Sequence, residues 1–361
     1  MKKLKTLLLI SLIACSCQRY AEDLSYTIEA DTLDYIPTYS QYGFYEDEQD
    51  NIYFYCKPMS CDSLLVYSLL DSTWTLYKYL KIPEVYSDTV DMDYSVGRWA
   101  LVNMDTVIAY ANFKHFTFLD IKNNSVIQSI PIIADTAFDV RSFNPMQWNK
   151  HRGTLGLMFF GLKDTGDIEM MSEYSPSKGL KVFSLKYPRE IMDTYLMDYG
   201  CEPYTVFFKD TLVVAFQNSP LMYCYDIKTQ KTTRFFLKNK YYTPLPKLDT
   251  TRYSKIGAPN FLYEIHLVNY FYNSLVYDHH KEVYYRFFSN ALPLENDEGF
   301  FYTWDDKVFG VNLIDKNFNI IGDVCFQPHD CRHIYYPTKK GLYHAYQYDE
   351  YTEISLLTFK Y

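Results

Sequence analysis

One phrase recurs along most of this chain: an alternating apolar segment, a short polar turn, and a second segment of the same kind. Seven such hairpins can be counted, and their tips fall near residues 72, 123, 177, 229, 280, 316 and 350. The first five tips are spaced by about fifty residues and the last two steps by about thirty-five. A period of about 40 to 50 residues is typical of a β-propeller, in which four-stranded sheets repeat around an axis.

The aromatic content supports strands throughout. The chain has 38 tyrosines and 25 phenylalanines but only 13 glycines, and aromatic residues favour the pleated, half-buried surface of a sheet. We therefore predict an all-β protein, a β-propeller with six or seven blades, with Asp71, Asn123, Gln230 and Lys316 at hairpin turns. A pair of β-sandwiches is the rival architecture, but its hairpins would not keep a fifty-residue period.

The short spacing of the last hairpins predicts how the ring closes. Steps of about thirty-five residues leave room for only three strands per blade. We expect a strand near residues 24–30 to complete one of these blades, because such closure protects the exposed edge of a sheet.

The N-terminal segment carries the pattern of a bacterial export signal. Three lysines precede an apolar run that is too short to span a bilayer. The run ends in Leu12-Ile13-Ala14-Cys15, which resembles the lipobox of bacterial lipoproteins. We predict a lipoprotein signal peptide at 1–14, lipid (palmitate) attachment at Cys15, a short tether at 15–23 and a single propeller domain at 24–361. An ordinary signal peptide, or acylation of Cys17, is the alternative.

These features predict a protein of the cell envelope, lipid-anchored to the outer membrane, with the periplasmic or surface face left open. Loss of residues 1–14 removes Lys2, Lys3 and Lys5, so the formal charge changes from −9 to −12. An acidic chain has no general attraction for nucleic acid. The expected partners are therefore the membrane, through the lipid, and a glycan, a peptide or an envelope protein.

Several short phrases resemble a known family. Tyr277-Asp278 is followed by Lys281 and then by the run Tyr284-Tyr285-Arg286-Phe287-Phe288, and a late strand contains Gly341-Leu342-Tyr343. These phrases are similar to the tyrosine-rich propeller lipoproteins of Bacteroidota assigned to a domain of unknown function, which are loosely similar to six-bladed, TolB-like propellers. The resemblance implies an exported lipoprotein with a propeller body, and it implies no catalytic residues.

Sequence signatures of common enzymes are missing. The glycines form neither a dinucleotide-binding nor a phosphate-binding loop, and the hydrolase motifs G-x-S-x-G and H-E-x-x-H do not occur. We expect no cofactor. We also expect no metal site, because the cluster Cys325, His329, Cys331 and His333 lacks the spacing of a zinc knuckle, and the acidic stretch 88–93 lacks the glycine of a calcium loop.

The cysteines leave the redox question open. Cys56 with Cys61, and Cys325 with Cys331, are close enough in sequence to close short disulfide loops. The alternative is that these cysteines are buried as small apolar residues in strands.

Two groups of residues are candidates for function. Glu264 and His266 lie two apart in an expected strand, hence on one face, where a carboxylate and an imidazole can act as acid and base. Tyr284, Tyr285 and Arg286 are candidates for ligand binding, since arginine beside aromatic rings binds carboxylates and aromatic platforms suit sugars or peptides. The simpler interpretations are a structural Glu–His pair, and an arginine that packs between blades and pairs with a neighbouring acid. His279 and His280 are expected to be solvated turn residues.

We therefore predict a non-enzymatic binding or interaction module. The alternative is a polysaccharide hydrolase or lyase with its site on the propeller axis. A cluster of perturbed acids around a deep axial pocket would favour the enzyme, whereas a plugged channel with an aromatic or apolar patch on one rim would favour the binder.

Overall fold

The protein is described by a computed structural model. The described residues are 22–23, 25–33, 39–58, 63–70, 73–82, 97–111, 115–131, 138–139, 147–162, 168–175, 179–183, 185–186, 188, 203–217, 219–243, 267–299, 301–303, 306–326, 335–348 and 351–360. The predicted signal peptide, Cys15, the acidic stretch 88–93, Glu264 and His266 lie outside these ranges.

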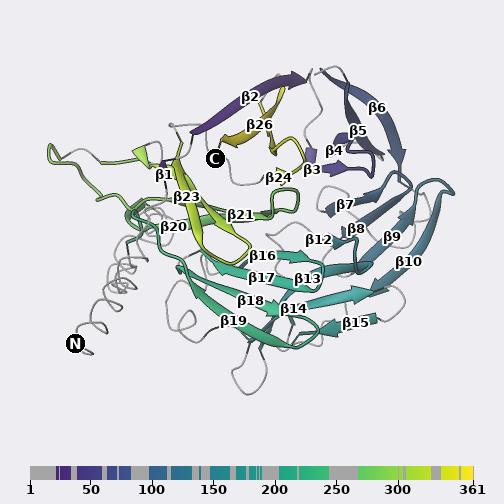
Figure 1. Cartoon of the computed structure of the whole chain (residues 1–361). Helices are drawn as coiled ribbons and strands as arrows, with labels where there is room; N and C mark the ends of the chain where they lie inside the picture. Colours follow the sequence, from purple (N-terminus) through teal and green to yellow (C-terminus); the bar gives the residue numbers. More distant parts are fainter. Residues whose placement is uncertain are drawn as a thin grey trace, which may run out of the picture.

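The described strands form six sheets arranged around a common centre, so the fold is the predicted all-β propeller, with six blades (Figure 1). We number the blades along the chain. Blade 1 contains β3 (Tyr39–Glu46), β4 (Ile52–Pro58), β5 (Ser63–Leu70) and β6 (Thr73–Lys81). Blade 2 contains β7 (Gly97–Asn103), β8 (Thr106–Ala111), β9 (His115–Asp120) and β10 (Ser125–Pro131). Blade 3 contains β11 (Phe138–Asp139), β12 (Gln147–Asn149), β13 (Thr154–Leu162), β14 (Ile168–Ser175) and β15 (Gly179–Val182).

The remaining blades follow the same plan. Blade 4 contains β16 (Pro203–Phe208), β17 (Thr211–Phe216), β18 (Leu221–Asp226) and β19 (Lys231–Phe236). Blade 5 contains β20 (Phe271–Asp278), β21 (Val283–Ser289), β22 (Phe309–Asp315) and β23 (Ile320–Cys325), and β1 (Glu22–Asp23) adds to it in parallel. Blade 6 contains β24 (Tyr336–Pro337), β25 (Leu342–Gln347), β26 (Thr352–Lys360) and β2 (Ser25–Leu33).

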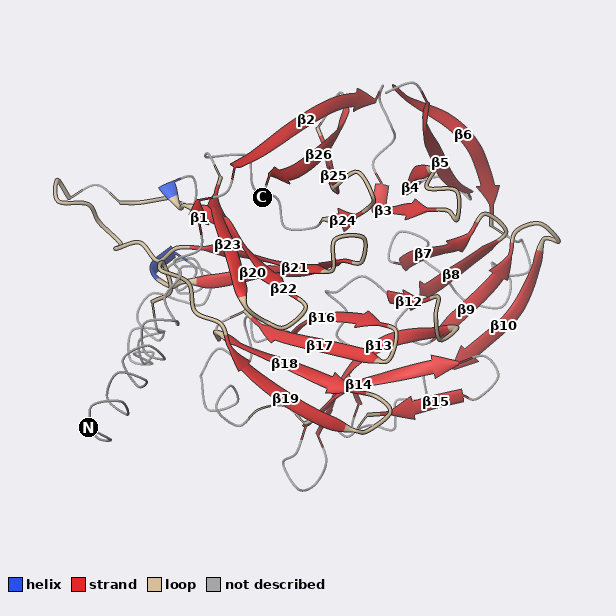
Figure 2. Cartoon of the chain, in the orientation of Figure 1, coloured by secondary structure: helices blue, strands red, loops and turns tan. Residues whose placement is uncertain are grey.

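Strand β2 closes the ring. It pairs antiparallel with β26 from Ser25 opposite Lys360 to Leu33 opposite Thr352, so the start of the described chain supplies the outer strand of the last blade (Figure 2). The expectation that a strand near residues 24–30 completes a blade is confirmed. Strand β1 lies within the segment predicted as a tether, and its two residues pair with Gly322 and Asp323.

The count of seven hairpins exceeds the six blades because two hairpins share one sheet. The hairpin near residue 280 joins β20 to β21 and the hairpin near 316 joins β22 to β23, and all four strands belong to blade 5. Among the described residues between β21 and β22, a bridge joins Phe301 to Glu295. Phe301 follows a turn at Gly299, whose φ of 83° interrupts an extended strand.

The aromatic content is explained by the position of each strand in its blade. Every residue of β4 and of β21 is buried, because both faces of an inner strand pack against neighbouring blades. Outer strand β19 is exposed along most of its length, and its sequence is correspondingly polar. Tyrosine suits the inner positions, since it fills a packed layer and keeps a polar end for a hydrogen bond.

The hairpin turns are stabilised by aspartate side chains. Asp120 accepts a hydrogen bond from the backbone N–H of Asn123, and Asp226 accepts one from Thr229. Gln230 has a positive φ of 57°, and Lys316 lies in the turn that Asp315 closes. Asn123, Gln230 and Lys316 therefore occupy turns as predicted, and Asp71 lies outside the described residues. Such Asx turns fix hairpin register locally.

Helical structure in the described residues is limited to short turns at 267–268 and 306. None of the described helical segments is long and apolar enough to cross a membrane.

Candidate binding site in the axial cavity

Every blade contributes residues to the wall of a cavity at the centre of the ring. The cavity has a volume of about 680 Å³, and strands β3, β7, β12, β16 and β20 and residues 335–337 contribute to its wall. The innermost strands of a propeller line its axial channel. Aromatic residues are common in the wall: Phe44, Tyr45, Tyr55, Trp99, Trp148, Phe207, Phe208, Tyr277, Tyr335 and Tyr336.

Some of this aromatic wall is available to a ligand. Tyr45, Trp148 and Phe208 are half-buried, whereas Trp99 and Tyr335 are buried in the packing between blades. Burial raises the pKa of the Tyr45 hydroxyl, and the negative charges of Asp47 and Glu48 raise it further. The tyrosine therefore stays neutral and offers a hydroxyl together with an apolar ring.

Gln147 joins two blades at the cavity wall. Its side-chain amide N–H donates to the carbonyl oxygen of Thr205, and its side-chain oxygen accepts from the backbone N–H of Phe207 at 2.7 Å. These two bonds fix β12 of blade 3 and β16 of blade 4 relative to each other. The wall is therefore held by hydrogen bonds as well as by ring packing.

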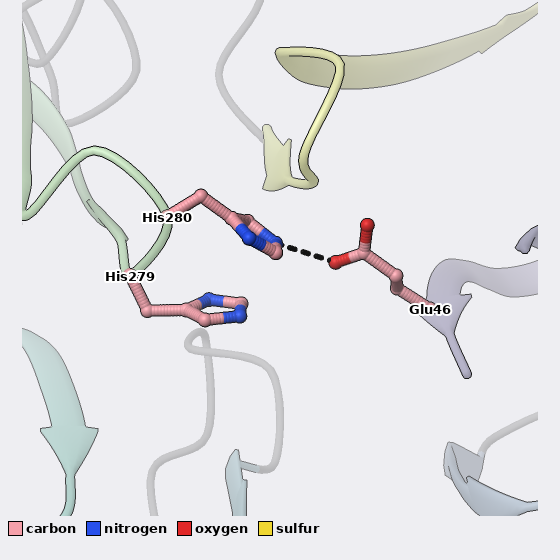
Figure 3. Close-up of side chains that lie close together, drawn as sticks. All are labelled: Glu46, His279 and His280. Carbon is pink, nitrogen blue, oxygen red and sulfur yellow. Dashed lines mark hydrogen bonds and ion pairs between the residues drawn. The ribbon is translucent and has the colours of Figure 1, made fainter. Parts of the chain in front are cut away.

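A group of two imidazoles and one carboxylate lies at the edge of the cavity (Figure 3). His279 and His280 form the turn between β20 and β21, and Glu46 ends β3. The Nε2 atom of His280 lies 2.7 Å from Oε2 of Glu46, and the ring centroids of the two histidines are 3.9 Å apart. One potential ligand atom from each residue lies within 4.8 Å of the others.

The electrostatics of this group are mixed. Burial, His280 and Lys150 lower the pKa of His279, and the negative charges of Glu46 and Asp278 only partly oppose them. His279 is therefore expected to be a neutral imidazole at neutral pH. Neutral imidazole has a free nitrogen lone pair, which can accept a proton, accept a hydrogen bond or bind a metal.

The expectation that His279 and His280 are both solvated turn residues is wrong for His279. They do lie in a turn, and His280 is exposed, but His279 is half-buried and lines the cavity. Sequence reasoning missed this because Glu46 and His280 are 234 positions apart. The available signal was two adjacent histidines at the tip of an inner hairpin.

Arg286 is buried between blades 4 and 5 and lies away from the cavity wall. Its guanidinium donates to the carbonyl oxygens of Phe216 at 3.1 Å, Ser219 at 2.6 Å and Pro220 at 3.3 Å. It also stacks 3.4 Å from the centre of the Tyr272 ring. The arginine packs between blades, as in the simpler interpretation, but these bonds are to backbone carbonyls, not to an acid.

The tyrosines beside it are divided between the two faces of β21. Tyr284 packs on Phe318 in the cluster between blades 4 and 5, whereas Tyr285 stacks on Phe359 of blade 6. The two side chains thus lie on opposite faces of β21, as neighbouring residues of a strand do. Both tyrosines are buried, so ligand binding by Tyr284, Tyr285 and Arg286 stays a prediction without support from their position.

The three cysteines in described ranges, Cys56, Cys224 and Cys325, are thiols and not halves of a disulfide. Neither of the short disulfide loops considered from the sequence is therefore closed at Cys56 or at Cys325. Cys56 is fully buried in the cluster between blades 1 and 6, which agrees with the alternative of a small apolar core residue.

Comparison with known proteins identifies the fold. No family model and no curated protein matches the sequence. The structure is similar to that of a DUF4221 family member from Bacteroides vulgatus, with a TM-score of 0.70 and 15% identity, over 95% of this chain and 99% of that one. It is also similar to a candidate exported protein from Bacteroides fragilis, with a TM-score of 0.53 and 8% identity, over 92% and 96% of the two chains. The predicted resemblance to Bacteroidota propellers of unknown function is thus confirmed for the fold, which this chain shares over nearly its whole length.

Proposed function

We propose that this protein is an exported, lipid-anchored binding module that takes a short glycan or a peptide segment into its axial cavity. The observation that carries the proposal is the aromatic wall of the cavity. A volume of about 680 Å³ falls within the range of small-ligand sites, which are mostly apolar with a few polar groups that fix orientation. Half-buried rings such as Tyr45 and Trp148 offer stacking surfaces for a sugar face or a side chain.

Charge at the cavity edge adds a basis for orientation. Glu46 and Glu48 come from blade 1, and Lys150 follows β12 in blade 3. A ligand with its own polar groups would meet an acidic side and a basic side. Because the chain is acidic, it has no long-range attraction for nucleic acid. A ligand that is neutral or carries both charges is therefore the better fit.

Ligand binding is tested with matched variants of one blade. We expect at least one member of a panel of defined neutral, amino-sugar and uronic-acid oligosaccharides and hexapeptides to bind the mature protein, measured by calorimetry and by tryptophan fluorescence. Tyr45→Leu should weaken this binding about tenfold or more, because a stacked ring contributes roughly 1–3 kcal/mol. Tyr79→Leu makes the same change on exposed outer strand β6 and should leave binding unchanged.

Two outcomes would contradict the binding module. Failure of the whole panel to bind, or equal weakening by both variants, would remove the cavity as the binding site. Release of shortened oligosaccharides, followed by chromatography, would instead support the alternative, a polysaccharide hydrolase or lyase.

The anchor is tested separately. The proposal of a lipid anchor rests on the lipobox-like residues before Cys15, because several acyl chains on one residue hold a protein durably at a bilayer. We expect Cys15→Ser to move the protein from the membrane fraction to the soluble fraction and to abolish labelling with radioactive palmitate. Cys17→Ser should change neither. A Cys15→Ser protein that still sediments with membranes and still carries labelled lipid would assign the anchor elsewhere.

A further inference from the structure

The group at the edge of the cavity combines donors that suit a transition metal. Two imidazole nitrogens and one carboxylate oxygen, from His279, His280 and Glu46, lie within 4.8 Å of one another. Both histidine rings extend toward the carboxylate across the space between blades 5 and 1 (Figure 3). Imidazole with carboxylate is a ligand set that zinc and its neighbours in the first transition row use, whereas calcium and magnesium prefer oxygen alone.

The distances are close to those of a bound ion. Zinc bonds of about 2.0 to 2.1 Å in a tetrahedron place neighbouring ligand atoms roughly 3.3 Å apart. The His280–Glu46 pair at 2.7 Å is slightly closer than this, as expected when a hydrogen bond occupies the place of a metal. A ring nitrogen of His279 lies within 4.8 Å of the ligand atoms of the other two residues.

Neighbouring groups hold the carboxylate and the turn in place. The backbone N–H of Lys339 donates to Oε1 of Glu46 at 3.0 Å, which leaves Oε2 directed to the histidines. Oδ1 of Asp278 accepts from the backbone N–H of His280 at 2.9 Å and of Lys281 at 3.1 Å, so it fixes the turn that presents both imidazoles. Outer partners of this kind orient metal ligands and raise affinity.

Negative charge also lies beside the group. Asp278 is fully buried, and among the described residues its Oδ2 accepts no hydrogen bond. Its negative charge lies close enough to act on His279, as does that of Glu46. Lys150 opposes them, but it is exposed and its charge is screened by solvent.

We propose that Glu46, His279 and His280 bind one divalent transition metal ion, with zinc as the reference ion, at the edge of the axial cavity. Three protein ligands leave at least one coordination position for water or for a donor atom of a bound molecule. Because His279 and Glu46 both line the cavity, the open position adjoins the space in which a ligand would lie. This proposal goes beyond the binding module and does not depend on it, since metal binding is measured without any organic ligand.

The test uses the mature full-length chain, with Cys15→Ser for solubility and without a histidine tag. We expect Zn²⁺, titrated in competition with a chromogenic chelator, to bind with one-to-one stoichiometry. His279→Ala, His280→Ala and Glu46→Gln should each weaken affinity for Zn²⁺ by at least about tenfold, a loss that removing only a hydrogen-bond partner of a metal ligand can already cause. In Glu46→Gln the amide oxygen still accepts from Lys339, so the backbone contact is retained. Zn²⁺ should also raise the melting temperature of the parent protein but not of the variants.

His151→Ala is the matched control. His151 also lies on this side of the ring, where its ring packs on Phe208, which in turn packs on His279. This variant should bind Zn²⁺ like the parent, because its imidazole is not one of the three ligands. Co²⁺ should give visible d–d bands without the intense near-ultraviolet band of a thiolate ligand, which distinguishes this site from binding at a cysteine.

Three results would overturn the proposal. The first is no saturable binding of Zn²⁺ or Co²⁺ by the folded parent protein. The second is affinity that none of the three substitutions changes, and the third is a Co²⁺ spectrum dominated by thiolate. In each case the Glu46–His280 contact would be only a structural hydrogen bond between blades.

Discussion

Arg286→Ala is expected to lower the free energy of unfolding by about 4 kcal/mol, one of the largest losses that a single substitution gives. The side chain is fully buried, so its removal leaves a cavity between blades 4 and 5. It also removes hydrogen bonds to four backbone carbonyl oxygens, of which that of Ser219 is the nearest at 2.6 Å. A hydrogen bond from a charged donor contributes about 1.5–3 kcal/mol. Urea denaturation followed by fluorescence measures the loss.

Two further variants separate the causes. Arg286→Met fills most of the volume but cannot donate, so we expect an intermediate loss of about 2 kcal/mol. Arg234→Ala replaces an arginine by alanine on exposed strand β19. It should lower the free energy of unfolding by less than about 0.5 kcal/mol. If Arg286→Ala cost no more than Arg234→Ala, the guanidinium would not hold the blades together. A Met variant as stable as the parent would instead mean that burial of the charge offsets its hydrogen bonds.

The hydrogen-bond partners of Arg286 could not be predicted from the sequence. Alternation along a strand is local, and it separates Tyr284 and Arg286 from Tyr285. Only the structure shows that the first two face blade 4 and that Tyr285 faces blade 6. The partners of the guanidinium are backbone carbonyls about seventy positions away. A backbone acceptor has no side-chain signature, because every residue carries one. The sequence therefore predicted the buried face and not the contacts made there.

The count of seven hairpins for six blades has a similar cause. Each hairpin is specified by a local turn, such as the Asx turn at Asp315, and was predictable. Which hairpins share a sheet depends on pairing between distant strands. In blade 5 the segment between β21 and β22 is long, covering residues 290–308, so one blade produced two widely spaced hairpin tips. The count of seven therefore came from loop length and not from an extra sheet.

The cavity and its edge were beyond prediction for a geometric reason. Glu46 and His280 come from blades 1 and 5, and they meet only because the ring closes. The two adjacent histidines are visible in the sequence, but nothing there singles out Glu46 among 44 acidic residues as their partner. The pair that sequence did single out, Glu264 and His266, lies outside the described residues, and its role stays a prediction.

Ring closure itself depends on strand β2, which contacts more than its own blade. Leu33 is buried in the cluster between blades 1 and 6, and Tyr26 and Ile28 pack against the cluster between blades 5 and 6. The hydroxyls of Thr27 and Thr358 lie 2.6 Å apart across the pair β2 and β26. The strand thus covers the edge of β26 and packs at both interfaces of blade 6.

A chain that begins after Leu33 is therefore expected to lose most of its stability, which for a domain is about 5–15 kcal/mol. Without β2 the full edge of β26 is exposed, and an uncovered edge promotes aggregation. We expect the truncated protein to show no cooperative thermal transition by calorimetry and to elute as aggregates. A synthetic peptide of residues 22–33, added during refolding, should restore a monomer and a transition by pairing with β26, whereas a scrambled peptide of equal composition should not. If the truncated chain unfolds at the parent temperature and the peptide changes nothing, then β2 only lies along blade 6, and the ring is closed by the packing of its inner strands.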